Sequence, residues 1–235
     1  MKNDAFRAPL GCAVICVVVL LSVGAGRTLA AEPTAPPPMS TPAAPPAGQY
    51  QLDKSHASLQ LRVSHLGFST YTTRFSRFDA ELTFDPAKLT AAQVVTTIDA
   101  ASLEMDGAPA QCIDIVRGPQ FMDTRKFPKI IFRSQHVRMT GTKSMEISGT
   151  LELHGVTRPM VLTATYNGGY PGMPEMDPHA RIGFSAHGAF KRSDFGMAYG
   201  VPAPGTTMGV GDLIEVSIEA EFSGPALATP AGATH

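Results

Sequence analysis

The sequence MEISGTLELHGVTRPMVLTATY, residues 145–166, decides the fold. Apolar residues occupy every second position from Met145 to Leu153, and apolar or aromatic residues do so again from Met160 to Tyr166. Side chains alternate faces along a β-strand, so each run predicts a strand with one buried and one solvent-facing surface. The segment between the two runs contains Gly155, which suits a tight turn. This stretch therefore predicts a β-hairpin.

The same alternation recurs along most of the chain. It is found at 50–52, 59–63, 78–84, 94–100, 130–134, 182–190 and 214–222. Only two short helices are expected, at Leu89–Gln93 and Ile113–Arg117. Many antiparallel strands with one apolar face pack as a sandwich or close into a barrel. Because the strands are long and most connections are short, we predict an all-β fold: an extended antiparallel up-and-down barrel of about eight strands.

The inward positions leave two interpretations of the interior open. Several of these positions hold small residues: Ala80, Ala100, Gly149, Ala164, Ala186, Gly188 and Ala220. A barrel of about eight strands can be filled by its own side chains or can hold one small ligand. Small residues leave volume for a ligand, but a small residue can equally face a large one across an ordinary core. Periodicity alone does not separate a cavity from a filled barrel that works through its surface.

Residues 1–30 have the layout of a secretory signal peptide. Lys2 and Arg7 precede an apolar run from Cys12 to Val23, and small residues at 28 and 30 suit cleavage before Ala31. The apolar run is shorter than the roughly 20 residues that span a bilayer, which favours cleavage over a retained anchor. We therefore expect a periplasmic or secreted protein with no stable membrane span after cleavage.

The composition of the remaining chain sets the expected domain boundaries. Residues 31–48 are rich in Pro and Ala, which predicts an extended linker rather than a packed element. Residues 49–223 carry the alternating strands and form the predicted barrel. Residues 224–235 resemble the linker in composition and predict a disordered tail.

Charge and cysteine content exclude several classes of function. The chain has 19 Lys and Arg against 20 Asp and Glu, and a net charge near zero argues against nucleic acid as a partner. Cys12 and Cys16 lie in the predicted signal peptide, so Cys112 is the only cysteine of the mature chain. No intramolecular disulfide can then form, and we expect the thiol to be buried rather than paired with another molecule.

We find no catalytic signature in the sequence and predict a protein that is not an enzyme. Paired carboxylates, zinc-ligand spacing and a Ser/His/Asp arrangement are absent, and no catalytic residue, metal or cofactor is expected. His65 and His154 lie near glycines at strand ends and are interpreted as turn residues. A weaker hypothesis is a Cu(I) site in the loop that holds Met173, Met176, Asp177 and His179.

Several short motifs follow one another in a fixed order along the chain. They are Tyr50-x-Leu52-Asp53, Val63-Ser64-His65-Leu66-Gly67-Phe68, Phe75-x-x-Phe78-Asp79, Phe121-Met122-Asp123, Phe127-Pro128-x-Ile130-x-Phe132, Leu151-x-Leu153-His154-Gly155-Val156-Thr157-Arg158-Pro159 and Arg192-Ser193-Asp194-Phe195-Gly196-Met197. In this order and spacing they resemble the YceI-like family of secreted, polyisoprenoid-binding proteins. The resemblance runs from about Tyr50 to Phe222, nearly the whole predicted barrel.

The resemblance implies a lipocalin-like barrel with a hydrophobic tunnel that holds an isoprenoid-chain lipid, either a polyprenyl compound or an isoprenoid quinone. It also allows a homodimer. The alternatives are a carrier of another amphiphile, such as a fatty acid or amide, and a quinone-linked redox or stress protein. Two departures bear on the ligand. The family often has Gly-x-Phe where this chain has Thr73-Arg74-Phe75, and often has Arg-Asp-x-His-Leu-Arg where residues 112–117 keep only Arg117.

The candidate binding residues are the apolar, inward-facing members of the strands. We predict a ligand-binding lining of Leu61, Val63, Phe78, Leu82, Phe132, Leu151, Leu153, Leu162, Phe184, Val216 and Ile218. For each of them a place in an ordinary barrel core is the competing interpretation. Arg117, Arg125 and Lys126 are predicted to form a polar rim near the tunnel mouth. The resulting hypothesis is a periplasmic protein that holds an isoprenoid lipid for transport or storage.

Overall fold

The computed structural model describes residues 43–227, so the predicted signal peptide, most of the linker and the last eight residues lie outside the described part. The strands are β1 (Gly48–His65), β2 (Ser69–Phe75), β3 (Phe78–Phe84), β4 (Gln93–Asp99), β5 (Leu103–Glu104), β6 (Lys129–Met139), β7 (Ser144–Leu153), β8 (Val156–Tyr170), β9 (His179–Lys191) and β10 (Val210–Ala226). One α-helix, α1 (Ala110–Arg117), and the 3-10 turns Leu89–Ala91, Ala100–Ser102 and Arg192–Phe195 complete the described fold.

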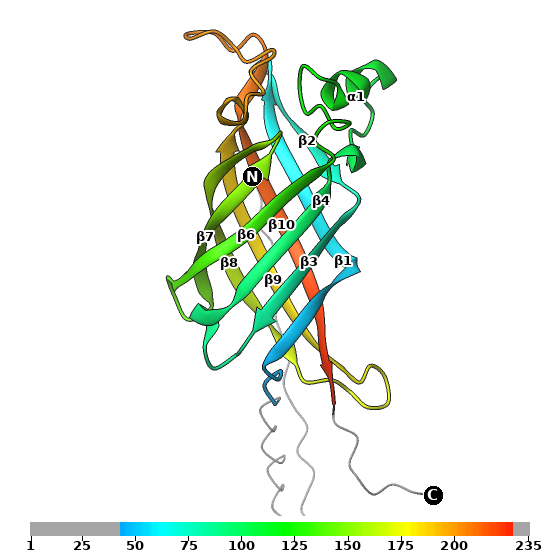
Figure 1. The fold of residues 1–235 in the computed structure, drawn as a ribbon, viewed down its shortest axis with the longest axis vertical. Helices are drawn as coiled ribbons and strands as arrows, with labels where there is room; N and C mark the ends of the chain where they lie inside the picture. The colour runs from blue at the N-terminus through cyan, green and yellow to red at the C-terminus, as the bar shows by residue number, and fades with distance from the viewer. Residues whose placement is uncertain (1–42, 228–235) are drawn as a thin grey trace, which may run out of the picture. The chain divides into compact units, whose positions relative to one another are not determined.

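These strands close into a barrel (Figure 1). Each pairs antiparallel with its neighbour, and β1 pairs with β10 from Gln51–Ser223 to His65–Val210, which joins the two ends of the sheet. Residues 48–51 of β1 pair with β3 and residues 60–65 pair with β2. β5 pairs with β2 as β4 pairs with β3. β2 and β3 therefore act as one interrupted strand, as do β4 and β5. The predicted eight-stranded antiparallel barrel with short helices is confirmed.

The hairpin that decides the fold is built on a two-residue turn. Leu153 pairs with Val156, and His154 and Gly155 between them both have positive φ, 53° and 73°. Such turns match the twist of the flanking strands but strain residues with a side chain. His154 is held by its Nδ1, which lies 2.9 Å from the carbonyl oxygen of Phe195, and by edge-to-face packing on Phe127. The structure thus places His154 in the turn, as predicted.

Near its lower end β1 carries an irregular segment that is fixed by a polar network. Its pairing with β10 shifts register between Leu52 and Ala57. Asp53 in this segment accepts hydrogen bonds from Ser55, His56 and Arg181, and Arg181 also bonds to Asp177 (2.7 Å). The hydrogen bond from Ser55, followed by that from His56, holds the pKa of Asp53 well below its usual range. The network ties β1 to β9 on the outside of the barrel.

The barrel extends slightly beyond both of its predicted boundaries. β1 begins at Gly48, and Pro45 in the predicted linker is buried. The carbonyl of Pro46 accepts a hydrogen bond from the Tyr50 hydroxyl (2.7 Å). β10 continues to Ala226, so the predicted start of the tail at 224 is wrong. Gly224 belongs in the strand because its backbone lies against the ring of Tyr50, where a Cβ would come within 2.1 Å.

We predict that Asp53 makes stability depend on acid pH. Its pKa in the folded protein lies below the 3.8 of an ordinary carboxyl group. The contribution of Asp53 to the free energy of unfolding is therefore complete at neutral pH. It is lost as the pH falls from about 5 towards and through the lowered folded-state pKa. Asp53→Asn should lower the free energy of unfolding at pH 7 and flatten its decline in acid, as measured by urea unfolding between pH 7 and 3.

Asp79→Asn is the matched control for this experiment. Asp79 also pairs with a cation, Lys54 at 2.6 Å, but both side chains are largely exposed, and exposed pairs contribute about 0–1 kcal/mol. Equal effects of the two substitutions would contradict the role assigned to Asp53.

Candidate functional site

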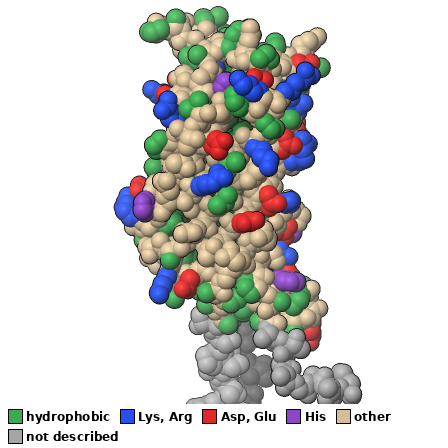
Figure 2. Space-filling view, in the orientation of Figure 1, with side chains coloured by type: hydrophobic (Ala, Val, Ile, Leu, Met, Phe, Trp, Pro, Cys, Tyr) green, Lys and Arg blue, Asp and Glu red, His purple; other side chains and the backbone are tan. Residues whose placement is uncertain are grey.

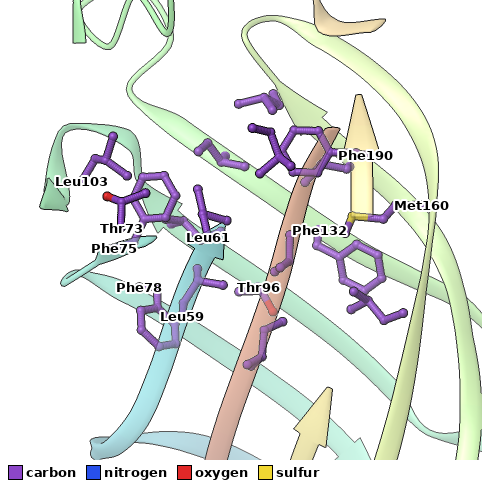
Figure 3. A pocket seen from close by; sticks show the side chains of 18 of the residues that line it. Leu59, Leu61, Thr73, Phe75, Phe78, Thr96, Leu103, Phe132, Met160 and Phe190 are labelled. Atoms are coloured by element: carbon purple, nitrogen blue, oxygen red, sulfur yellow. The ribbon is translucent and has the colours of Figure 1, made fainter. Parts of the chain in front are cut away.

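The inside of the barrel contains a long apolar cavity of about 650 Å³. Its lining extends along β10 from Val210 to Phe222. With a rise of about 3.3 Å per residue and a strand tilt of 35–45°, these twelve steps correspond to a tunnel roughly 30 Å long. Figure 3 shows side chains from several strands directed into this space, among them Leu61, Phe132 and Met160.

The residues that the sequence predicted as lining all border this cavity. These are Leu61, Val63, Phe78, Leu82, Phe132, Leu151, Leu153, Leu162, Phe184, Val216 and Ile218. Five of them are only half-buried: Leu61, Val63, Phe78, Phe184 and Ile218. Their contact with a ligand stays a prediction, because the structure contains none.

The small inward residues divide into three groups, and Ala100 forms the first, since it is buried in the 3-10 turn Ala100–Ser102 and does not border the cavity. Ala80, Ala164, Ala186 and Ala220 border the cavity and leave it open. Gly149 and Gly188 instead allow close packing, because a Cβ would lie 3.0 Å from Phe132 at the first and 2.8 Å from Leu162 at the second. Some small inward residues therefore leave volume for a ligand, and others face a large residue across an ordinary core.

Aromatic rings close the lower end of the tunnel. Phe84 packs on Tyr50, Tyr166 and Phe184 with ring centroids 5.6–6.1 Å apart, and Phe184 in turn packs on Phe222. Tyr50 and Phe84 are almost completely buried. Burial raises the pKa of Tyr50 to about 12, so this hydroxyl stays neutral. The rings leave the opposite end as the opening.

The open end lies beside α1. There the lining includes exposed residues, among them His65, Ile115 and Tyr199. Cys112 on α1 is half-buried and faces the same space, so the prediction of a buried thiol is only partly met. A chain entering the barrel would pass between α1 and the loop that precedes β10.

Arg192 is a buried cation in the lining that the sequence reasoning missed. Its side chain is 2% exposed. Its Nε donates to the carbonyl of Gly211 (3.0 Å), and its two Nη atoms donate to Met197, Tyr199 (2.9 Å) and Val210 (2.8 Å). All four carbonyls belong to the segment 197–211, so Arg192 holds the loop that forms one side of the mouth. Burial lowers the pKa of this guanidinium.

The signal for Arg192 was present in the sequence. The inward series Ile182, Phe184, Ala186, Gly188 and Phe190 continues with period two to position 192, which is a charge on an otherwise apolar face. A charge there must find internal partners, because burying it unpaired is costly.

The predicted polar rim of Arg117, Arg125 and Lys126 does not border the cavity. Arg117 donates to the carbonyl of Leu103 (2.7 Å), and its buried Nε has no partner among the described residues. Arg125 and Lys126 are exposed, and the ammonium of Lys126 lies 5.1 Å from the ring centre of Phe127. Arg125 and Lys126 turn outward because solvent stabilises their charges better than the apolar tunnel would.

The Met-rich loop considered for copper lies at the lower end of the barrel. Asp177 is engaged by Arg181 and lies 3.2 Å from the Nδ1 of His179. Asp53, His56 and Glu221 nearby also bring potential ligand atoms within 4.8 Å of one another. The guanidinium of Arg181 pairs with Asp53 and Asp177. Its positive charge would repel a metal ion bound there, so we assign these polar residues a structural role.

The chain is similar in sequence and in structure to several known proteins. A family model described as a YceI-like domain matches residues 50–222. A UPF0312 protein of Vibrio cholerae is 32% identical over 187 residues, which cover 78% of this chain and 91% of that protein. The crystal structure of the Campylobacter jejuni YCEI protein aligns with a TM-score of 0.59 and 28% identity, over 69% of this chain and 90% of that one.

A more distant structure shares the fold alone. The polyisoprenoid binding domain from Saccharophagus degradans aligns with a TM-score of 0.55 at 15% identity, over 75% of this chain and 98% of that one. Among the described residues, no helix combines the length and apolar character needed to cross a membrane.

We predict that Arg192→Met destabilises the barrel by roughly 3 kcal/mol, because four loop carbonyls lose their donor inside a water-poor site. Urea unfolding would measure this loss. Arg158→Met is the matched control, since Arg158 is exposed and makes one bond to a carbonyl, that of Asp194 at 3.2 Å. Equal stability of the two variants would show that Arg192 does not hold the loop.

Proposed function

The chain belongs to the YceI-like domain family, and on that premise we propose that it binds an isoprenoid-chain lipid in the barrel tunnel. The ligand class is a polyprenyl compound or an isoprenoid quinone. The tunnel itself is the observation that carries the proposal, because it is apolar, continuous and open at one end. Of the described residues that line it, none is Asp or Glu.

The shape of the tunnel favours a single long chain. The cavity of about 650 Å³ is spread over roughly 30 Å along the strands, so it is much longer than it is wide and suits an extended chain. A bilayer core of about 30 Å holds two acyl chains end to end, so the tunnel is about twice as long as one of them. An isoprenoid chain uses this length better than an ordinary fatty acid.

The burial of such a chain supplies ample binding free energy. Each five-carbon isoprene unit removed from water contributes roughly 4 kcal/mol, at about 0.8 kcal/mol per carbon. Association and ordering cost several kcal/mol, which the first units offset. The lipid chain alone can therefore account for binding. This agrees with residues 112–117, where only Arg117 remains of the basic run that the family often has.

We place the protein in the bacterial periplasm and assign it transport or storage of the lipid. The support for this location is the layout of residues 1–30, with a positive start, an apolar run and small residues before Ala31. A water-filled compartment between two membranes is where a chain that water rejects needs a carrier. The Arg192-held opening gives that chain a route in and out.

We predict that Ala186→Phe blocks the tunnel and lowers lipid binding at least about tenfold, because the new ring fills the channel that the chain requires. Ala186 borders the cavity, whereas Ala189 on the same strand is exposed. Ala189→Phe is therefore the matched control and should bind as the wild type does. Binding of an isoprenoid quinone, measured by fluorescence quenching or calorimetry, separates the two variants.

Native mass spectrometry of protein purified from its own cells tests the proposal directly. We expect an adduct with the mass of an isoprenoid lipid in the wild type and in Ala189→Phe, and its loss in Ala186→Phe. A co-purified fatty acid or amide would replace the ligand class. Protein that carries no lipid and takes up no added quinone would overturn the proposed function.

A further inference from the structure

Exposed apolar side chains gather around the mouth of the tunnel. Phe68 is 81% exposed, Met208 65%, Tyr199 52% and Ile115 48%. They come from the β1–β2 turn, the segment before β10 and α1. Single exposed apolar residues are common on protein surfaces, whereas a group of them marks a contact surface. We call these four residues the mouth rim.

Backbone and ring contacts hold most of the mouth rim together. The Leu66 N–H donates to the carbonyl of Gly209 (2.8 Å), which joins the β1–β2 turn to the segment that carries Met208. The ring of Tyr199 packs on that of Phe121 at 5.8 Å. Tyr199 and Ile115 are both exposed and part of the tunnel lining, so the rim is continuous with the tunnel wall.

Two of the three segments that carry the rim also lack charge, and α1 is the exception. Residues 197–211 and 66–73 contain no Asp, Glu, Lys, Arg or His. In Figure 2 the extreme upper end carries hydrophobic and uncharged side chains, whereas charged ones lie along the flank. The exposed carboxylates of Asp106 and Asp114 belong to the α1 side. A protein surface that enters lipid must avoid charges, because charged side chains are costly in hydrocarbon.

The opposite end of the barrel differs in this respect. The β8–β9 loop there also exposes an apolar residue, Met176 at 81%. It lies among Glu175, Asp177 and His179, and the tunnel at that end is closed by aromatic rings. The described chain also begins and ends at this lower end, at the start of β1 and the end of β10 (Figure 1). The mouth lies at the other end from these two points of the described chain.

We propose that the mouth rim docks on the surface of a lipid bilayer, with Phe68 and Met208 entering the boundary between head groups and acyl chains. Tyr199 suits the same depth, since its ring is apolar and its hydroxyl reaches water. Docking would join the tunnel to the bilayer interior, so a lipid chain passes between them without crossing water. This inference rests on the proposed lipid-binding function.

The segments 66–73 and 197–211, which carry Phe68, Tyr199 and Met208, contain no basic residue, which argues for docking through apolar side chains rather than through a basic surface. Binding by a polybasic surface requires anionic lipid and weakens with salt. Docking through apolar side chains does not require anionic lipid and is not weakened by salt. The rim should therefore engage vesicles of zwitterionic phosphatidylcholine, and added salt should change the rate of lipid transfer little.

The test compares the uptake of an isoprenoid quinone from two sources. Lipid-free protein receives the quinone either from phosphatidylcholine vesicles or from detergent micelles, and bound quinone is measured over time after separation. We expect Phe68→Ser/Met208→Ser to slow uptake from vesicles at least about tenfold, since two apolar anchors are lost. Its final loading from micelles should equal that of the wild type.

Met176→Ser is the matched control, because it removes an equally exposed apolar side chain at the other end of the barrel. It should transfer quinone at the wild-type rate. Thermal unfolding of each variant verifies the fold, and the single variant Met208→Ser, with an intermediate rate expected, replaces the double variant if that one is unstable.

The possible results separate this inference from the proposed function. A double variant that loads from vesicles as fast as the wild type overturns membrane docking and leaves lipid binding intact. So does a wild type that loads from micelles but not from vesicles, which would indicate a protein partner at the mouth. A wild type that loads from neither source overturns both the proposed function and the docking.

Discussion

The pairing of β1 with β10 is the constraint on which the rest of the structure depends. It removes both edges of the sheet and commits alternate residues of every strand to a common interior. Eight strand positions enclose a space that side chains can fill only if enough of them are large. Here Ala80, Ala164, Ala186 and Ala220 stand where larger residues would close it. The tunnel follows from closure combined with these small residues.

The two ends of the barrel differ in structure. At the lower end Tyr50, Phe84 and Phe184 pack edge to face and close the barrel, and the network of Asp53 and Arg181 ties β1 to β9 outside it. At the upper end no such closure is formed by the described residues. Arg192 instead holds the uncharged loop 197–211 through hydrogen bonds to its carbonyls. The loop is thereby fixed at one side of the mouth, and the mouth stays open. One end is closed by aromatic rings, and the other leaves the tunnel open.

Local periodicity was sufficient to predict most of this fold. Most strand positions, the His154-Gly155 turn and all eleven predicted lining residues depend on which face a side chain occupies, and a period of two indicates that directly. β2 (Ser69–Phe75) was not predicted, and the runs 50–52 and 59–63 are parts of one strand, β1. Features set by contacts distant in sequence were missed. Arg192 bonds to residues up to 19 positions away, and the packing of Tyr50 on Gly224 extends β10 beyond its predicted end. Arg117 was assigned to the rim because its sequence position indicates the loop but not the direction of its side chain.

The central claim is that the interior is a binding site for one long lipid chain rather than a core with gaps. A crystal structure of the protein isolated from its own cells, with no lipid added, tests it most directly. The account predicts continuous elongated electron density that starts between Ile115 and Tyr199 and ends against Phe184 and Phe222. A tunnel closed by side chains meeting across it, or one occupied only by ordered water, would contradict the account.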